Sequence, residues 1–337
     1  MRIFGFIVAA LAQVALFFAP AAAEPVKIRV TWVAIVTNMP SILFLKPGIA
    51  RHNGKSYEFE SLHFNSTPLM IPALATGDIE VATFAYSSLA AAIQKAGMDD
   101  IRVIADELQD GVPGYYSDEY MVKKDSPIRT IEDLKGKVLA SSGIGGAMDV
   151  PMREMLKKHG LDPLKDVTIV EVSMPNHRAA LADGKVDLIS SPLPFSEDPD
   201  LRQTARTLFT QRDAAGATQM ILWAARAGFL EKNRAAMVDF LEDTIHARRW
   251  WEDPANHAEA VKLVSEMTKQ SADHYDPWLF TKGDYYRDPD DLPNIQALQQ
   301  NVDELVAQGL LPGHIDMAAH ADLSLVKEAA ARVNSGK

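Results

Sequence analysis

The stretch MVKKDSPIRTIEDLKGKVLA, residues 121–140, is the part of this 337-residue chain that is most specific to one fold. Its apolar start predicts a strand that begins at Tyr120, and 130–134 predicts a single helical turn. Gly136 separates that turn from a second apolar run, which predicts the next strand. A strand, a short helix and another strand within so few residues are typical of an α/β lobe.

Strands and helices are predicted to alternate in the same way on both sides of this stretch. Val26–Trp32 alternates apolar and polar residues with a period of two, which indicates a strand. Thr67-Pro68 predicts a helix start, because threonine caps helices and proline is tolerated in the first turn. This alternation favours parallel sheets covered by helices on both faces. The other predicted strands are 57–64, 81–84, 101–105, 168–172 and 186–190, and the other predicted helices are 41–51, 87–96, 147–159 and 176–183.

Turn-forming residues predict where the chain passes between two lobes. Asp110-Gly111-Val112-Pro113-Gly114 has the chemistry of a turn and marks a boundary. An apolar run returns at 217–224, and the pattern from Phe229 onward is mostly helical. About 310 residues beyond the N-terminal segment are enough for two lobes of about 150 residues each. We therefore expect lobe I at 24–114 plus 225–337 and lobe II at 115–224, joined by two hinge crossings.

Residues 1–23 have the pattern of a secretory signal peptide. Arg2 supplies a positive charge, 3–18 is almost entirely apolar, and Ala21 and Ala23 fit the small-residue cleavage pattern. We expect cleavage before Glu24 and export to the periplasm; an uncleaved anchor helix is the competing interpretation. No cysteine follows for lipid attachment, so we expect a protein that is not anchored to the membrane.

The composition argues against several functional classes. The chain has no cysteine, which removes disulfides, thiol nucleophiles and thiolate metal sites. Its 34 basic and 45 acidic residues give a net charge of −11, which argues against a nucleic-acid partner. The nine histidines lack the spacing of metal ligands, so we expect no metal site. The glycines within 143–146 lack a phosphate-binding lysine and dinucleotide spacing, so we expect no cofactor.

Four segments resemble the periplasmic binding proteins of ABC importers for nitrate, sulfonates, taurine and thiamine-precursor-like molecules, the NMT1-like family. The third segment is the most specific, and its specificity is to the fold rather than to a ligand. The resemblance implies an α/β, two-lobed periplasmic-binding-protein fold of type II. Each lobe would be a doubly wound sheet, with the ligand in the cleft between the lobes. The four segments are 28–45, 73–82, 122–138 and 180–187.

The family resemblance implies a ligand site at the carboxyl ends of the strands, where open α/β sheets bind ligands in general. That rule selects the residues that follow each predicted strand. Relatives often have a Gly-Gly run where this chain has Asn65-Ser66-Thr67, and a Trp-Asp-Pro-like stretch where it has 191–194, so no relative's ligand can be copied. The candidate ligand-binding residues are Trp32, Asn38, Asn65, Ser66, Thr67, Tyr86, Ser87, Ser142, Gly145, Gly146, Ala147, Pro192 and Phe195.

Two of the selected loops precede predicted helices, whose free amides and partial positive charge suit an anion. Asn65–Thr67 and 142–146 are therefore candidate cradles for a sulfonate or carboxylate head group, although simple helix capping explains the same residues. Trp32 and Tyr86 are the aromatic residues that we most expect to contact the ligand, and core packing is the competing interpretation for each.

These features predict a monomeric binding protein that captures a small, anionic organic solute and delivers it to an ABC permease with its ATPase. Sulfonates and aromatic carboxylates fit the expected cleft best, and nitrate and pyrimidines remain alternatives. A ligand receptor for a sensor system and a thiamine-pyrimidine-precursor binding protein are the alternative functions. We expect no enzymatic activity, because the enzymes on this fold that make the thiamine pyrimidine depend on a cysteine-rich motif.

Overall fold

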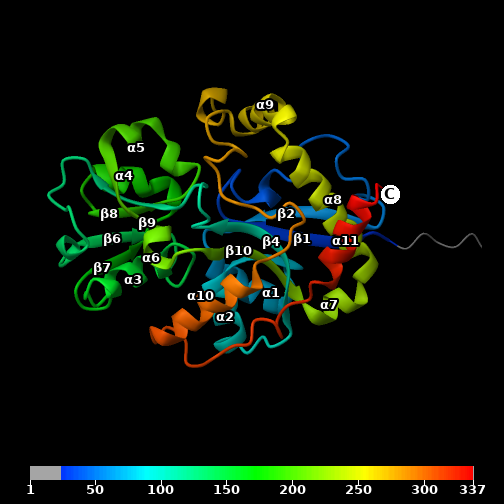
Figure 1. The fold of residues 1–337 in the computed structure, drawn as a ribbon, viewed down its shortest axis with the longest axis horizontal. Helices are drawn as coiled ribbons and strands as arrows, with labels where there is room; N and C mark the ends of the chain where they lie inside the picture. The colour runs from blue at the N-terminus through cyan, green and yellow to red at the C-terminus, as the bar shows by residue number, and fades with distance from the viewer. Residues whose placement is uncertain (1–23, 337) are drawn as a thin grey trace, which may run out of the picture.

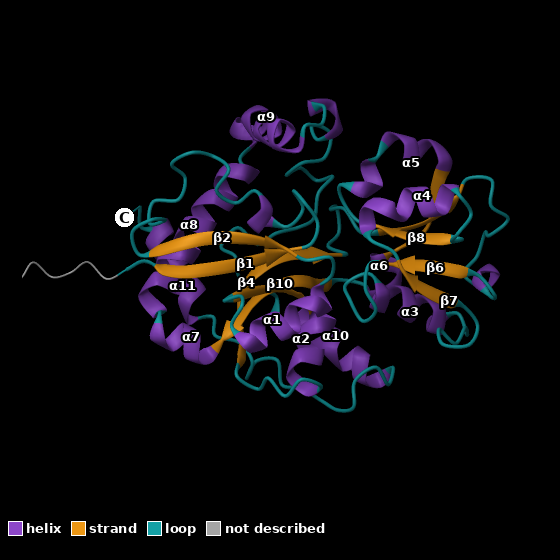
Figure 2. Cartoon of the chain, turned by 180° about the vertical axis from the view of Figure 1, so that it is seen from behind, coloured by secondary structure: helices purple, strands orange, loops and turns teal. Residues whose placement is uncertain are grey.

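A computed structural model describes residues 24–336 as two α/β lobes, each built on its own five-stranded sheet (Figure 1). The predicted signal peptide, 1–23, lies outside the described residues. Among 24–336, no helix combines the length and apolar character that a membrane span requires. Figure 2 shows β6 (Val138–Ser141), β7 (Thr168–Glu171) and β8 (Leu188–Ser191) of lobe II at one end of the molecule, and the larger lobe I at the other.

The sheet of lobe I has the strand order β2-β1-β3-β10-β4. β1 is parallel to β2 and β3, and its register with β2 runs from Val26 opposite Tyr57 to Trp32 opposite His63. β10 is antiparallel to both β3 and β4. The sheet is therefore mixed, with one strand returning against the others. The strands are β1 (Val26–Trp32), β2 (Tyr57–His63), β3 (Val81–Ala85), β4 (Ile101–Asp110) and β10 (Thr218–Arg226).

The sheet of lobe II repeats this arrangement with the order β7-β6-β8-β5-β9. β6 is parallel to β7 and β8, whereas β5 is antiparallel to β8 and β9. The parallel strands end on the side of lobe II that faces lobe I (Figure 2). The strands are β5 (Glu119–Lys123), β6 (Val138–Ser141), β7 (Thr168–Glu171), β8 (Leu188–Ser191) and β9 (Ala205–Thr210).

Helices cover both faces of the lobe I sheet. α2 and α10 pack together in one apolar cluster with β3 and β10, through residues such as Leu89 and Leu298. α8 and α11 pack in a second cluster on the other face, through residues such as Phe240 and Val326. The helices are α1 (Met70–Thr76), α2 (Tyr86–Gln94), α3 (Asp149–Lys158), α4 (His177–Ala182), α5 (Pro199–Thr204), α6 (Gln211–Ala215), α7 (Ala227–Lys232), α8 (Arg234–Glu252), α9 (His257–Thr268), α10 (Ile295–Ala307) and α11 (Ser324–Asn334).

Two expectations from the sequence are wrong. The run 217–224 was expected at the end of lobe II, but β10 pairs between β3 and β4, so the second crossing to lobe I precedes Thr218. The helix expected at 41–51 does not form, and the chain turns there after a short 3₁₀ helix at Met39–Ser41. Pro47 lacks an amide donor and Gly48 adopts φ +77°, and both oppose a helix.

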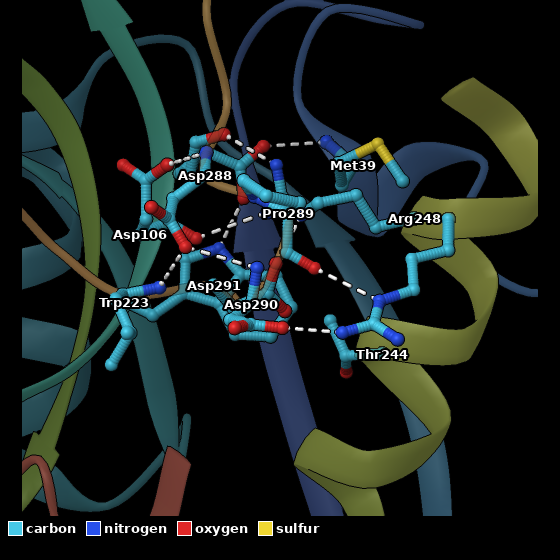
Figure 3. Close-up of polar contacts among 12 residues, drawn as sticks. Met39, Asp106, Trp223, Thr244, Arg248, Asp288, Pro289, Asp290 and Asp291 are labelled. Carbon is cyan, nitrogen blue, oxygen red and sulfur yellow. Dashed lines mark hydrogen bonds and ion pairs between the residues drawn. The ribbon is translucent and has the colours of Figure 1, made fainter. Parts of the chain in front are cut away.

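A buried arginine fixes the parts of lobe I that face the cleft (Figure 3). Arg248 of α8 is 0% exposed and forms an ion pair with Asp291. Its guanidinium also donates to the carbonyl oxygens of Asp106, at 3.1 Å, and Glu107, at 3.2 Å. The carboxylate of Glu107 in turn accepts the amide of Met39 at 2.5 Å. These contacts join α8, β4, the segment around 291 and the loop after β1.

The carboxyl groups around Arg248 are buried, and burial disfavours their ionised form. Burial raises the pKa values of Asp106 and Glu107, and burial raises the pKa of Asp291 to about 8. Arg248 opposes this effect in all three carboxyls, because its positive charge favours the ionised form. The network is therefore stable only while the guanidinium is present.

Replacing Arg248 by methionine should destabilise the protein by about 3–5 kcal/mol, because uncompensated buried carboxyls remain. The matched control is Arg249→Met, since Arg249 pairs with Asp290 at a site where both side chains are about one third exposed. That substitution should cost about 1 kcal/mol or less. Urea denaturation of both variants measures the difference, and equal losses would contradict the structural role of Arg248.

Candidate ligand-binding site

A cavity of about 40 Å³ lies where loops of the two lobes meet, and we call it the central cavity. Lobe I contributes the loops after β1 and β2, parts of β4 and β10, and Tyr285. Lobe II contributes the loop between β6 and α3, the loop after β7 and the loop after β8. Its lining residues are Val33, Ala34, Thr37, Asn38, Ser66, Thr67, Leu108, Ser142, Gly146, Ala147, Met148, Met174, Pro192, Met220, Ile221 and Tyr285.

A second cavity of about 310 Å³ adjoins the first, and we call it the outer pocket. The two cavities share Val33 and Met174 as walls. Trp32 of the outer pocket lies against His63, with ring centroids 4.5 Å apart, and its indole donates to Ser61 at 3.0 Å. The lining residues of the outer pocket are Trp32, Val33, Ile35, His63, Asn65, Ser173, Met174, Pro175 and Phe195.

Most of the candidate residues from the sequence lie on one of these two cavities. Three candidates line neither cavity, namely Tyr86, Ser87 and Gly145. The central cavity includes Asn38, Ser66, Thr67, Ser142, Gly146, Ala147 and Pro192, and the outer pocket includes Trp32, Asn65 and Phe195. The contact of each of these residues with a solute stays a prediction.

The three remaining candidates pack against or bond to other parts of the protein. Tyr86 is 1% exposed and belongs to the apolar cluster of α2 and α10, where burial raises its pKa well above the ordinary value. The hydroxyl of Ser87 donates to the carbonyl of Gly145 at 2.9 Å. Because Ser87 belongs to lobe I and Gly145 to lobe II, this bond joins the lobes beside the central cavity.

Several lining residues carry no signal in the sequence. Leu108, Met220 and Ile221 belong to strands β4 and β10, whose side chains read as ordinary core positions. Tyr285 follows a segment without helical or strand periodicity, and only the fold brings it to the cleft. A rule based on strand ends could not select these residues.

The loop after β1 is shaped by its own polar side chains. The carbonyl oxygen of the Asn38 side chain accepts the amides of Val33 and Ala34, both at 2.9 Å. The hydroxyl of Ser41 accepts the amide of Val36 at 2.9 Å, and Val36 adopts a left-handed φ of 70°. These bonds hold the loop as a tight turn and place Asn38 on the wall of the central cavity.

Leu193 of lobe II is held by lobe I through both its backbone groups. Thr37 donates its hydroxyl to the Leu193 carbonyl at 2.6 Å, and the Leu193 amide donates to the hydroxyl of Tyr285 at 3.2 Å. The same tyrosine hydroxyl donates to the carboxylate of Asp118, which begins lobe II. Two lining residues of lobe I therefore hold lobe II in the closed arrangement.

One cluster of potential metal ligands lies away from both cavities. His52, Asp239 and Glu242 have ligand atoms within 4.8 Å of one another. Arg332 already supplies positive charge there, since its guanidinium lies 2.9 Å from Asp239 and 3.5 Å from Glu242. The cluster needs no metal ion to balance its carboxylates.

Comparison with known proteins places this chain in a family. The family model described as "NMT1-like family" matches residues 21–265, which is most of the chain. The chain belongs to the NMT1-like family. The two-lobed fold is similar to that of the alkanesulfonate-binding protein SsuA from Xanthomonas axonopodis pv. citri bound to MOPS, with a TM-score of 0.71. The two chains are 20% identical, and the match covers 90% of this chain and 100% of that chain.

Two curated relatives of this NMT1-like protein are named as binding proteins. The nitrate/nitrite binding protein NrtA of Synechococcus elongatus is 27% identical over 50% of this chain and 41% of its own length. The taurine-binding periplasmic protein of Escherichia coli is 25% identical over 64% of this chain and 66% of its own length. The chain thus spans less than two thirds of each. The desulfurization enzyme DSZB also shares the fold, at 14% identity, a TM-score of 0.64 and coverage of 93% of this chain and 100% of that chain.

The lobes of this NMT1-like protein lie close together at Gly143. A Cβ atom at that position would lie 2.5 Å from the Cβ and 2.7 Å from the hydroxyl oxygen of Ser66. Real carbon atoms do not approach so closely without displacement of the backbone. Nearby, Val150 of α3 packs into the apolar cluster of lobe I. The structure is therefore a closed form in which the two lobes are in contact.

Gly143→Ala should hinder closure and lower the affinity for solute at least about tenfold, a loss of about 1.4 kcal/mol. Stability should change little, because Gly143 has no positive φ that would strain an alanine. Gly228→Ala is the control, since a Cβ there meets nothing within 4 Å. Calorimetric titration compares the two, and unchanged affinity in Gly143→Ala would contradict closure around the solute.

Closure also brings a carboxyl into an apolar, like-charged setting. Glu154 of α3 is 2% exposed, and burial together with Glu304 of α10 raises its pKa to about 7. Lys158 and Lys157 on the same helix oppose this shift. The folded, closed protein therefore binds a proton that an open or unfolded chain releases above its ordinary pKa of 4.5.

As the pH rises from about 4.5 to 7, the free energy of unfolding should fall by up to about 3 kcal/mol because of this group. The folded state binds more protons than the unfolded state in this range. Glu154→Gln should remove this part of the pH dependence and raise stability at pH 8. Glu231→Gln, at an exposed position of α7, is the control. Urea titrations at pH 5, 6, 7 and 8 measure the effect, and parallel curves for wild type and Glu154→Gln would contradict the assignment.

Proposed function

We propose that this chain is the solute-binding component of an ABC importer. It would work in the periplasm as a monomer, capture a small organic solute and deliver it to a permease with its ATPase. The observation that carries the proposal is the central cavity, whose walls come from both lobes. The named binding proteins among its relatives support the same role.

Closure of the lobes depends on a few hydrogen bonds between them. Leu193 supplies a backbone donor and a backbone acceptor to Tyr285 and Thr37, and Ser87 reaches the loop before α3. Each is a single hydrogen bond worth about 1 kcal/mol, so solute binding can decide between open and closed forms. The two hinge segments, near 111–118 and 211–217, are where we place the rotation.

Binding without covalent chemistry fits the groups that line the cavity. The nucleophile types among the described lining residues are serine, threonine and tyrosine hydroxyls. The hydroxyl of Thr67 pairs with Ser88 at 2.8 Å, and that of Thr37 donates to a carbonyl. No histidine lies beside a serine or threonine among these lining residues, whereas activated hydroxyls need a neighbouring base.

A ligand receptor for a sensor system is the second candidate function, because the same cavity serves capture and sensing equally well. Genes for a permease and an ATPase next to this gene would favour import. A lone histidine kinase gene would favour sensing. A thiamine-pyrimidine-precursor binding protein differs only in the solute and is included in the screen below.

A thermal-shift screen of the mature protein tests the proposal. The solute series contains sulfonates, carboxylates, carboxamides, pyrimidines and nitrate. Small-angle X-ray scattering measures the radius of gyration of the protein with each solute. A specific solute at 100 times its dissociation constant should stabilise the protein by about 2.7 kcal/mol and reduce its radius of gyration. The matched control is Gly143→Ala, which should show less compaction. Stabilisation of wild type without compaction would contradict capture between the lobes.

A further inference from the structure

No charged side chain lines the central cavity within residues 24–336. Among the described residues that line it, all are apolar, glycine, hydroxyl-bearing or the single carboxamide Asn38. Three methionines form a large part of the wall, namely Met148, Met174 and Met220. Thioether side chains adapt to irregular apolar shapes and to aromatic rings. This lining suits a solute whose body is apolar.

Two arginines on segments beside the cavity are engaged elsewhere. Asp149, below the loop that carries Ser142, accepts from the Gly145 amide and from Arg153, both at 2.7 Å. Arg287 pairs with Asp284 at 3.1 Å and donates to the carbonyl of Thr37 at 3.0 Å. Neither Arg153 nor Arg287 lines the cavity, and each is already paired with a carboxylate. An anionic solute would find no positive partner here.

The two loops expected to cradle an anion do not offer free helix ends. A three-residue 3₁₀ helix begins at Thr67 and is followed by the seven-residue α1, which is too short for a strong dipole. In the other loop, the Gly145 amide is directed at Asp149, a negative group at the start of α3. A buried anion without compensation costs several kcal/mol, so these loops disfavour one.

Three polar groups on the wall have no protein partner within residues 24–336. The side-chain carbonyl of Asn38 accepts two amides, while its NH₂ group donates to no group of the described chain. The hydroxyls of Ser66 and Ser142 likewise form no hydrogen bond within the described chain, and both line the cavity. One fixed donor and two hydroxyls can satisfy a carbonyl-type head group.

We infer that the solute is uncharged, with a carbonyl-type hydrogen-bonding head that contacts Asn38, Ser66 and Ser142 and an apolar body among the three methionines. The inference rests on the proposed function and names the class of solute for the same site. It replaces the anionic class expected from the sequence. The physical reason is the absence of a cation on the wall of the central cavity, as far as the described chain shows.

Pairs of nearly equal shape and different charge test the inference. The probes are propanamide with propanoate, benzamide with benzoate, and methanesulfonamide with methanesulfonate, titrated calorimetrically into mature wild-type protein at pH 7.5. We expect the uncharged member of at least one pair to bind at least tenfold more tightly than its anion. Asn38→Asp keeps the acceptor for Val33 and Ala34 but removes the donor, so it should weaken carboxamide binding at least tenfold.

Met174→Lys supplies the missing cation at a partly exposed wall position, and should increase the affinity for the anions at least tenfold. Ile144→Lys adds the same charge at an exposed site of lobe II outside the cavity, and should leave the ratio within each pair as in wild type. Tighter binding of the anions by wild type would overturn the inference and leave the proposed function standing. No binding of any probe, together with no response in the thermal-shift screen, would contradict both.

Discussion

The structure depends on one buried charge, the guanidinium of Arg248. It pairs with Asp291 and bonds to the backbone of β4 at Asp106 and Glu107. Glu107 then fixes Met39, and Asn38 beside it lines the central cavity. A charge this deeply buried requires complete pairing, so the groups that surround it have a single arrangement. These contacts fix the position of the loop after β1 in lobe I, while none of the described residues that line the central cavity is charged.

The contacts between the lobes have a different character. They are few hydrogen bonds from hydroxyls and backbone groups, such as those of Thr37 and Tyr285 to Leu193, and close packing at Gly143. Glu154 faces Glu304 across the same boundary, which weakens closure when both are ionised. Weak contacts of this kind allow a small solute to decide between open and closed forms, because its binding energy is comparable with theirs.

Local pattern predicted much of the fold, and chain breakers explain part of the failure. Val26–Trp32 is a strand with the predicted bounds, because period-two alternation on one buried face is an unambiguous signal. The helix expected at 41–51 ignored Pro47 and Gly48, and β9 (Ala205–Thr210) has too few apolar residues to stand out. Most of the candidate residues that the strand-end rule selected lie on one of the two cavities. Tyr285 and the methionines could not be selected, because only tertiary packing brings them together.

The central claim is that solute binding closes the two lobes. The chain has no cysteine, so Leu164→Cys in lobe II and Ala307→Cys at the end of α10 would carry the only two spin labels. Leu164 and Gln308, next to Ala307, line one groove between the lobes in the closed form. Pulsed electron resonance should show a short, narrow distance distribution with a stabilising solute and a longer, broader one without it. Identical distributions, with binding confirmed by calorimetry on the same sample, would contradict the account.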